Sequence, residues 1–304
     1  MSKHPTLLEH FRSFCFQNGA TDLEKAVEYF AVFGGMGWKV DMERPLEELI
    51  EEKVLKNYRY IHGDIAKITQ SDRTHHSVLS GIALGDRREH SAFKRANVSR
   101  QEGEESIDFL VGNDLLVREQ SQAQPVNERE EVSDKFMITL PFLRFWFSSI
   151  SPYYKGIRDG DYSEVRQRWE HTRQGFSDLI YDQLVIEFLK QSFTEDKIEK
   201  IGSYWDKSNE IAVLAKTRSG KIVAGSTKHA NSKAKKSELN ALKEQCAKAE
   251  LEPDILVIYA KNGFSNELKK EKNAGLKLVT LKHLKMLIAD LSEEDLIPYT
   301  NKKY

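Results

Sequence analysis

Apolar residues recur at helical spacing over much of the first 150 residues. The segments "LLEHFRSFCF" and "LEKAVEYFAVF" place them three and four positions apart, which predicts two amphipathic helices. Thr21, with Glu24 three positions later, has the pattern of a capping box that begins the second helix. We expect the glycines of "GGMG" to end that helix. A phosphate-binding loop is the less favoured alternative, because the spacing is not GxGxxG and no strand precedes it.

Residues 74–140 have a different rhythm, with short helical segments followed by two short apolar runs. Ser99 and Glu102 form a second capping-box pattern, which begins a helix. The runs "LLVREQ" and "KFMITL" predict two strands joined by a polar loop over residues 119–134. Helices followed by two such strands are the shape of a winged helix-turn-helix, and the long charged loop predicts a mobile wing tip.

The negative charge of the helix after Ser99 argues against binding of this helix in a DNA groove. It carries four carboxylates against Arg100 alone: Glu102, Glu104, Glu105 and Asp108. Carboxylates near phosphates are repelled and release no counterions. We therefore favour a packing or protein-contact role over groove recognition for this helix.

The segment "LPFLRFWFSSISPYYKGIRDG" is rich in aromatic residues. Phe142, Phe145, Trp146 and Phe147 have the chemistry to stack on nucleotide bases, but such a cluster more often forms a core, and we favour the core. A domain boundary is expected near residues 150–160.

From residue 161 onward the pattern alternates between helices and strands. A long helix is expected over 161–193 with a break near Gly175. Three strands (197–204, 210–217, 221–227), a lysine-rich helix (235–249), two more strands (253–260, 276–281) and a final helix follow. The whole chain is predicted to be α+β, with a mixed central sheet in its C-terminal part.

Composition limits the function classes. The 304 residues include 39% hydrophobic and 31% charged residues with a formal net charge of −1, so polyanion binding requires a local basic surface. The two cysteines, Cys15 and Cys246, lie in no zinc-binding pattern. No apolar run approaches the ~18 residues that span a membrane, and we expect a soluble, cytoplasmic protein without a membrane partner.

Positive charge is concentrated between residues 213 and 248. This segment contains nine Lys and Arg residues and only two acidic residues. Two interpretations stay open: a solvated lysine-rich surface, or a phosphate-binding surface next to a helix N-terminus. The residues proposed to bind nucleic acid, DNA or RNA, are Lys216, Arg218, Lys221, Lys228, Lys233, Lys235 and Lys236.

The order of elements after residue 161 resembles that of restriction-endonuclease-like folds. The segments "FLRFWFSSISPYYKGIRDGDYSEV", "QGFSDLIYDQL", "WDKSNEIAVLA" and "GSTK" also resemble the nuclease-like domain of unknown function found at the C-termini of archaeal-type ATPases. With the "AVFGGMGWKVD" segment, the resemblance covers nearly the whole chain, without the ATPase core. It implies a helical region (1–73), a winged-helix-like domain (74–150) and a restriction-endonuclease-like domain (151–304).

In that family the chemistry rests on carboxylates around Mg²⁺ and on a lysine that positions water. Where the family has Glu-Ile-Asp, this chain has Glu210, Ile211 and Ala212, and where it has Gly-Glu-x-Lys, this chain has Ser226 in place of the glutamate. Only Lys228 is retained. Alanine and serine cannot supply the carboxylates that Mg²⁺ requires, so we expect no metal and no cofactor, with Mg²⁺ as the alternative.

Asp178, Glu187 and Glu210 are the possible substitute carboxylates. Glu210 is a poor one, because it lies two residues before Ala212 and so about 6–7 Å further back on the strand. Three hypotheses remain. The first is a binding protein for nucleic acid or protein that does not cleave, the second a divergent metal-dependent phosphodiesterase, and the third a regulatory subunit of a separate ATPase. No GxxxxGK[ST] motif occurs in the chain.

Overall fold

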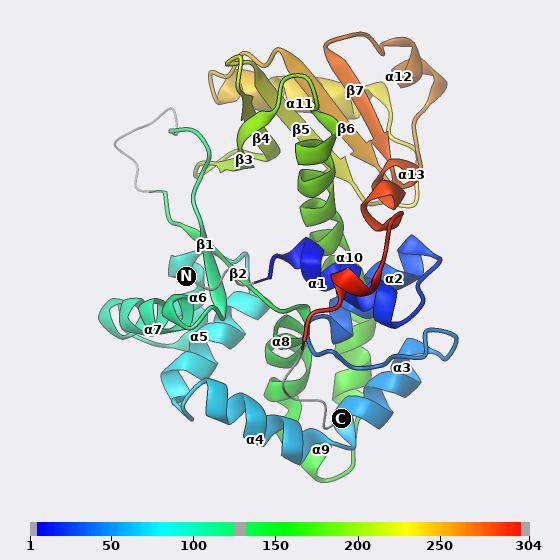
Figure 1. Cartoon of the computed structure of the whole chain (residues 1–304). Helices are drawn as coiled ribbons and strands as arrows, with labels where there is room; N and C mark the ends of the chain where they lie inside the picture. The colour runs from blue at the N-terminus through cyan, green and yellow to red at the C-terminus, as the bar shows by residue number, and fades with distance from the viewer. Residues whose placement is uncertain (1–4, 125–131, 299–304) are drawn as a thin grey trace. The chain divides into compact units, whose positions relative to one another are not determined.

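The computed structural model describes residues 5–124 and 132–298, which divide into two compact units (Figure 1). Unit 1 takes the described residues up to Glu119, from Ser133 to Ile180 and from Leu291 onward, and unit 2 takes the rest. No helix in the described ranges is both long and apolar enough to cross a membrane.

Unit 1 is largely helical. Its N-terminal helices are α1 (Leu7–Gln17), α2 (Leu23–Phe33), α3 (Leu46–Leu49), η1 (Ile50–Leu55) and α4 (Tyr58–Ile68). After the hairpin described below come α8 (Pro141–Phe145), η2 (Trp146–Ile150), η3 (Ser151–Tyr153), α9 (Tyr154–Arg158) and the start of α10 (Ser163–Ser192), and η5 (Glu293–Asp295) lies near the C-terminus.

The start of α2 differs from the prediction by one residue. Asp22, not Thr21, caps the helix, and its carboxylate accepts the N–H groups of Glu24 at 2.8 Å and Lys25 at 3.1 Å. One oxygen of the Asp22 carboxylate accepts both of these N–H groups, which would otherwise lack a partner in the first turn. This cap therefore fixes the start of α2 at Leu23. Gly34 ends α2, as expected from the glycine run.

The aromatic cluster forms the core of unit 1, as predicted. Phe142, Phe145, Trp146 and Phe147 are each 0% exposed. Trp146 stacks on Tyr58 with ring centroids 5.3 Å apart, and Phe145 meets Trp169 edge-on at 5.3 Å. Buried rings of this kind are not available to nucleotide bases.

Three helices and a hairpin occupy the middle of unit 1 in the predicted order. They are α5 (Arg73–Leu84), α6 (Glu89–Ala96), α7 (Arg100–Gly112), β1 (Leu116–Glu119) and β2 (Lys135–Ile138). The two strands pair antiparallel from Leu116–Ile138 to Glu119–Lys135. The Ser99–Glu102 capping box is present. The predicted wing tip falls largely on residues 125–131, outside the described residues.

Helix α10 runs unbroken from Ser163 to Ser192, so the predicted break near Gly175 is wrong. A glycine inside a helix costs only about 1 kcal/mol relative to alanine, which neighbouring turns and packing offset. Burial of Phe176 and Ile180 on one side of Gly175 and Trp169 on the other holds the helix through this position.

Unit 2 contains a five-stranded mixed sheet. Its strands are β3 (Ile198–Trp205), β4 (Glu210–Thr217), β5 (Ile222–Lys228), β6 (Ile255–Ala260) and β7 (Leu276–Thr280), in the order β3-β4-β5-β6-β7. The first three strands are antiparallel neighbours, and β5, β6 and β7 are parallel. The helices are α11 (Lys236–Lys248), α12 (Asn266–Lys270), α13 (Leu281–Leu284) and η4 (Lys285–Ile288). The prediction of an α+β chain with a mixed sheet is confirmed.

Side chains alternate between the two faces of this sheet. Leu214, Ala224 and Ile258 pack in one buried cluster with Leu239 and Leu242 of α11. Tyr259, the neighbour of Ile258, points to the other face and stacks with Tyr181 in the second half of α10, at 6.3 Å between ring centroids. The two helices therefore cover opposite faces of the sheet, because strand side chains alternate.

Candidate functional site

Lys228 is the last residue of β5 and belongs to the sheet face covered by α11. Its ammonium group donates a hydrogen bond to Oε1 of Glu238, in the first turn of α11. The other oxygen of Glu238 accepts the backbone N–H of Lys235 and the hydroxyl of Ser237, each at 2.9 Å. The side chains of Lys228 and Glu238 are only 22% and 25% exposed. Lys228, the one residue retained from the pattern that the resemblance implies, therefore forms an internal ion pair.

Glu238 is held in its charged form. Burial by itself raises the pKa of this carboxyl, but the hydrogen bonds from Lys228, from the backbone of Lys235 and from Ser237 outweigh burial and lower the pKa to about 2. Its charge lies at the N-terminus of α11, where unpaired backbone N–H groups favour an anion. The anion position that the sequence predicted beside this loop is therefore filled by the protein's own glutamate.

Ala212 and Ser226, where the resemblance implies metal ligands, lie close together in the sheet. Val213 of β4 pairs directly with Gly225 of β5, and Ala212 and Ser226 are the next positions along each strand. Ser226 in turn faces Ile258 of β6. No carboxylate comes from these positions.

The substitute carboxylates have other roles. Asp178 accepts a hydrogen bond from Gln174 at 2.6 Å, and Glu187 pairs with Lys190 at 2.7 Å. These two acids are nine residues apart on α10, which puts them on opposite sides of the helix at about 100° per residue. Glu210 is exposed at the start of β4, opposite Trp205. Among residues 5–124 and 132–298, no three His, Cys, Asp or Glu side chains are grouped so that they could hold a metal ion.

The basic stretch separates into two groups at the two ends of β5, about 20 Å apart at 3.3 Å per strand residue. The group at the β4–β5 hairpin consists of Lys216, Arg218 and Lys221, and Lys200 of the neighbouring strand β3 joins it; these four exposed residues are here called the hairpin cations. Lys200 of β3 pairs directly with Lys216 of β4. Like charges directly opposite one another destabilise a sheet, so this pair favours a counter-charge from outside.

The group at the other end, here called the loop lysines, consists of Lys233, Lys235 and Lys236. Lys236 pairs with Glu271 at 2.7 Å, and this hydrogen bond raises the pKa of Lys236. The hairpin cations form no ion pair with any described residue, although Asp196, held by the N–H of Ser219 at 3.0 Å, acts on Lys221 electrostatically. Lys233 and Lys235 are also exposed and form no ion pair in the described residues, so the two groups differ in that one of the loop lysines is engaged and none of the hairpin cations is.

The comparison with known families bears on this part of the chain. Residues 146–239 match a family described as "Archaea bacterial proteins of unknown function", domain of unknown function 234. The segment that matches domain 234 includes Ala212, Ser226, Lys228 and Glu238. No curated protein and no solved structure matches the chain.

The domain 234 segment also contains a hydrogen bond that the sequence analysis did not predict. Nε2 of His229 lies 2.7 Å from Oδ1 of Asp182 on α10. The His229 ring stacks with Tyr181 at 6.0 Å, and Nζ of Lys261 lies 5.6 Å from the Tyr181 ring centroid. This contact connects α10 with the end of β5, on the sheet face opposite the one that carries Lys228. Its only sequence signal was that His229 follows Lys228 directly.

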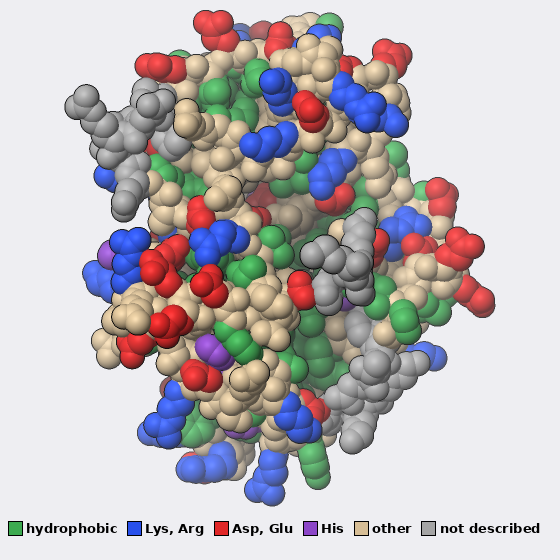
Figure 2. All heavy atoms as spheres, turned by 60° about the vertical axis from the view of Figure 1, so that its left-hand side comes forward, with side chains coloured by type: hydrophobic (Ala, Val, Ile, Leu, Met, Phe, Trp, Pro, Cys, Tyr) green, Lys and Arg blue, Asp and Glu red, His purple; other side chains and the backbone are tan. Residues whose placement is uncertain are grey.

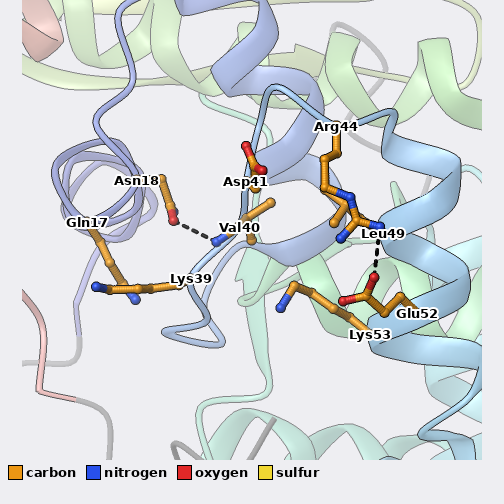
Figure 3. A pocket seen from close by; sticks show the side chains of 9 residues that line it. All are labelled: Gln17, Asn18, Lys39, Val40, Asp41, Arg44, Leu49, Glu52 and Lys53. Carbon is orange, nitrogen blue, oxygen red and sulfur yellow. Dashed lines mark hydrogen bonds and ion pairs between the residues drawn. The ribbon is translucent and has the colours of Figure 1, made fainter.

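A polar cavity of about 380 Å³ lies in unit 1 (Figure 3). Val40 and Leu49 line it together with charged side chains of both signs. Figure 3 shows the guanidinium of Arg44 joined to Glu52, a contact of 2.8 Å, and the N–H of Val40 bonded to Asn18 at 2.8 Å. Lys39, Lys53 and Asp41 complete the charged lining. The neutralised arginine and the mixed charges select no particular ligand.

Proposed function

We propose that unit 2 is a restriction-endonuclease-like domain that does not cleave, and that it binds a nucleic-acid backbone through the hairpin cations. The order of elements supports the fold: α10, three antiparallel strands, α11, two parallel strands and a final helix. Ala212 and Ser226 support the absence of cleavage, because neither supplies a ligand for Mg²⁺. The ion pair with Glu238 supports it further, because Lys228 is occupied.

One observation carries the binding role: the hairpin cations are exposed and form no ion pair among the described residues, with Lys200 directly opposite Lys216. Lysine and arginine contacts to phosphates give affinity without sequence choice, so we expect salt-sensitive binding with little base preference.

In unit 1, α5–α7 and the β1–β2 hairpin support the interpretation as a winged helix by their order. The carboxylates of α7 are exposed, and Glu104 holds the only basic residue of that helix, Arg100, at 2.7 Å. This face repels phosphates, and we assign it to packing or a protein partner. The alternative of a regulatory subunit for a separate ATPase rests on the resemblance alone.

Fluorescence-anisotropy titrations with short single- and double-stranded DNA and RNA, over about 50–200 mM salt, test the proposal. The first variant carries Lys216→Ala, Arg218→Ala and Lys221→Ala. The matched control carries Lys233→Ala, Lys235→Ala and Lys236→Ala, which removes the same charge from the other end of β5. We expect the hairpin variant to flatten the log–log salt slope by about 2–3 units on duplex DNA, and the control variant to change it less.

Either of two results would contradict the binding role: no binding by the unmodified protein at about 50 mM salt, or a larger loss in the loop-lysine variant. The phosphodiesterase alternative has its own assay. Cleavage that requires Mg²⁺ or Mn²⁺ and disappears in Lys228→Ala would replace the proposal with an active nuclease.

A further inference from the structure

A carboxylate from outside the β4–β5 hairpin is bound to the tip of that hairpin. Asp196 lies two positions before β3, and the first residue of β3, Ile198, pairs with Thr217 at the end of β4. This register brings Asp196 beside the turn that follows Thr217. Oδ1 of Asp196 accepts the N–H of Ser219 at 3.0 Å, and Oδ2 accepts the Ser219 hydroxyl at 2.5 Å.

Backbone contacts hold the turn in this position. The N–H of Arg218 donates to the carbonyl of Lys197 at 2.9 Å, which joins the turn to the segment before β3. Gly220 has a φ of +91°, a backbone conformation that favours glycine. The N–H and the hydroxyl of Ser219 are therefore presented together, and both point to the Asp196 carboxylate.

The charges around this carboxylate are those that suit an anion. The hydrogen bonds from Ser219 lower the pKa of Asp196, and the cation Lys221 acts in the same direction, so Asp196 is charged at neutral pH. Lys197 and Arg218 are exposed and form no ion pair with a described residue. Two converging donors next to cations are also the chemistry that holds a phosphate oxygen.

We propose that the N–H and the hydroxyl of Ser219 are a binding point for a backbone phosphate, and that Asp196 is its internal competitor. This inference rests on the proposed function, because it requires the hairpin cations to contact a nucleic-acid backbone. A carboxylate and a phosphate both offer anionic oxygens to the same donors. When a phosphate takes the donors, the Asp196 carboxylate loses them and still repels the phosphate. Asp196 therefore limits the affinity of the surface.

The anisotropy titrations on duplex DNA test the competition with Asp196→Ala. We expect this variant to bind about tenfold more tightly than the unmodified protein, because one hydrogen bond to a charged group contributes about that factor. The log–log salt slope should steepen by about one unit, for one additional phosphate contact.

Glu199→Ala is the matched control, because it removes the same charge three positions further along the chain. The Glu199 side chain is exposed and forms no hydrogen bond or ion pair in the described chain. We expect a smaller gain in affinity and an unchanged slope. Equal gains in Asp196→Ala and Glu199→Ala would show an effect of net charge alone and would overturn the proposal.

The role of Ser219 has its own variant. Ser219→Ala, added to Asp196→Ala, removes the hydroxyl and keeps the N–H, so we expect it to reverse part of the tenfold gain, by about threefold. A gain that survives in full would overturn the assignment of the phosphate to Ser219.

A further measurement needs no variant and holds even if these variants do not fold. In a ¹H–¹⁵N titration of the unmodified protein with the same duplex, the amide resonance of Ser219 should shift. The amide of Ala234, which donates to the carbonyl of Gly263 at 2.9 Å near the loop lysines, should shift less. Binding that leaves the Ser219 amide resonance unmoved would overturn the proposal.

The titrations separate this inference from the proposed function. Binding by Asp196→Ala but not by the unmodified protein would contradict the proposed function and support the competition. Binding that depends on the hairpin cations but is the same in Asp196→Ala would support the proposed function and overturn the competition. No binding by either protein at about 50 mM salt would overturn both.

Discussion

At the scale of single residues, ion pairs decide what the candidate side chains can do. Lys228 stands where the resemblance to nuclease-like domains implies a catalytic lysine, yet its ammonium group is bound to Glu238. Asp178 and Glu187 are likewise committed to Gln174 and Lys190. The residue types expected from the resemblance are thus present in part, but they are engaged within the fold.

The Lys228–Glu238 pair predicts a pH-dependent stability. The pKa of Glu238 is about 2 in the folded protein, below the unfolded value of about 4.3, so the pair contributes stability that is complete above about pH 5 and is lost as the pH falls toward 2. We expect Lys228→Met to lower the free energy of unfolding by about 1–2 kcal/mol at pH 7 and by less near pH 2.

Urea unfolding at the two pH values measures this difference. Lys233→Met is the control, because Lys233 is exposed and forms no ion pair in the described chain, and its effect should stay within about 0.5 kcal/mol. A loss in Lys228→Met that is equal at both pH values would show that the pair does not set the pKa of Glu238.

At the scale of elements, packing and capping set the limits of helices that sequence patterns only approximate. The predicted break in α10 is absent, and the first cap of α2 is Asp22 rather than Thr21. At the start of α2 the local cap decides, because the Asp22 carboxylate accepts two N–H groups of the first turn. In α10, packing decides, because buried side chains on both sides of Gly175 hold the helix through the glycine.

The continuity of α10 predicts that Gly175→Ala stabilises the protein. A Cβ at Gly175 would meet no atom within 4 Å, and alanine has the higher helix propensity, so we expect a gain of about 0.5–1 kcal/mol in the free energy of unfolding. Chemical denaturation measures the gain. Gly81→Ala is the contrast, since its Cβ would come 2.5 Å from the carbonyl oxygen of Ala92, and it should destabilise.

At the scale of the whole molecule, charge is dispersed. The formal net charge is −1, and Figure 2 shows Lys and Arg side chains interspersed with Asp and Glu side chains on the face it draws. A dispersed distribution gives no strong single-sign field, so polyanion binding must depend on a local group such as the hairpin cations. The binding test therefore compares two variants that each remove three cations, one from the hairpin cations and one from the loop lysines.

The dispersed carboxylates predict that millimolar Mg²⁺ or Mn²⁺ leaves the thermal unfolding midpoint unchanged, because stabilisation requires binding to the folded state. The double variant Ala212→Asp, Ser226→Glu introduces, on adjacent strands, the carboxylates that the resemblance implies. We expect it to gain a metal-dependent rise of the midpoint, measurable by differential scanning fluorimetry. A rise already present in the unmodified protein would reveal a metal site and would favour the phosphodiesterase alternative.

The sequence by itself determined most of the elements and their order. The helical spacing of "LEKAVEYFAVF" predicts α2, and the apolar run "PDILVIYA" predicts β6, because these patterns report burial along a single segment. It also determined that Ala212 and Ser226 supply no carboxylate where the resemblance implies metal ligands, since this depends only on residue type. The burial of the aromatic cluster around Trp146 was also predicted from residue type along a single segment.

Only the tertiary structure decided which polar side chains meet. Lys228 and Glu238 lie ten residues apart, and Asp182 and His229 forty-seven, on elements that the sheet and its two covering helices bring together. The division of the basic stretch into the hairpin cations and the loop lysines likewise follows from the length of β5 between them. Periodicity reports which side of an element is buried, whereas the partner of a side chain depends on packing between elements, which no local pattern contains.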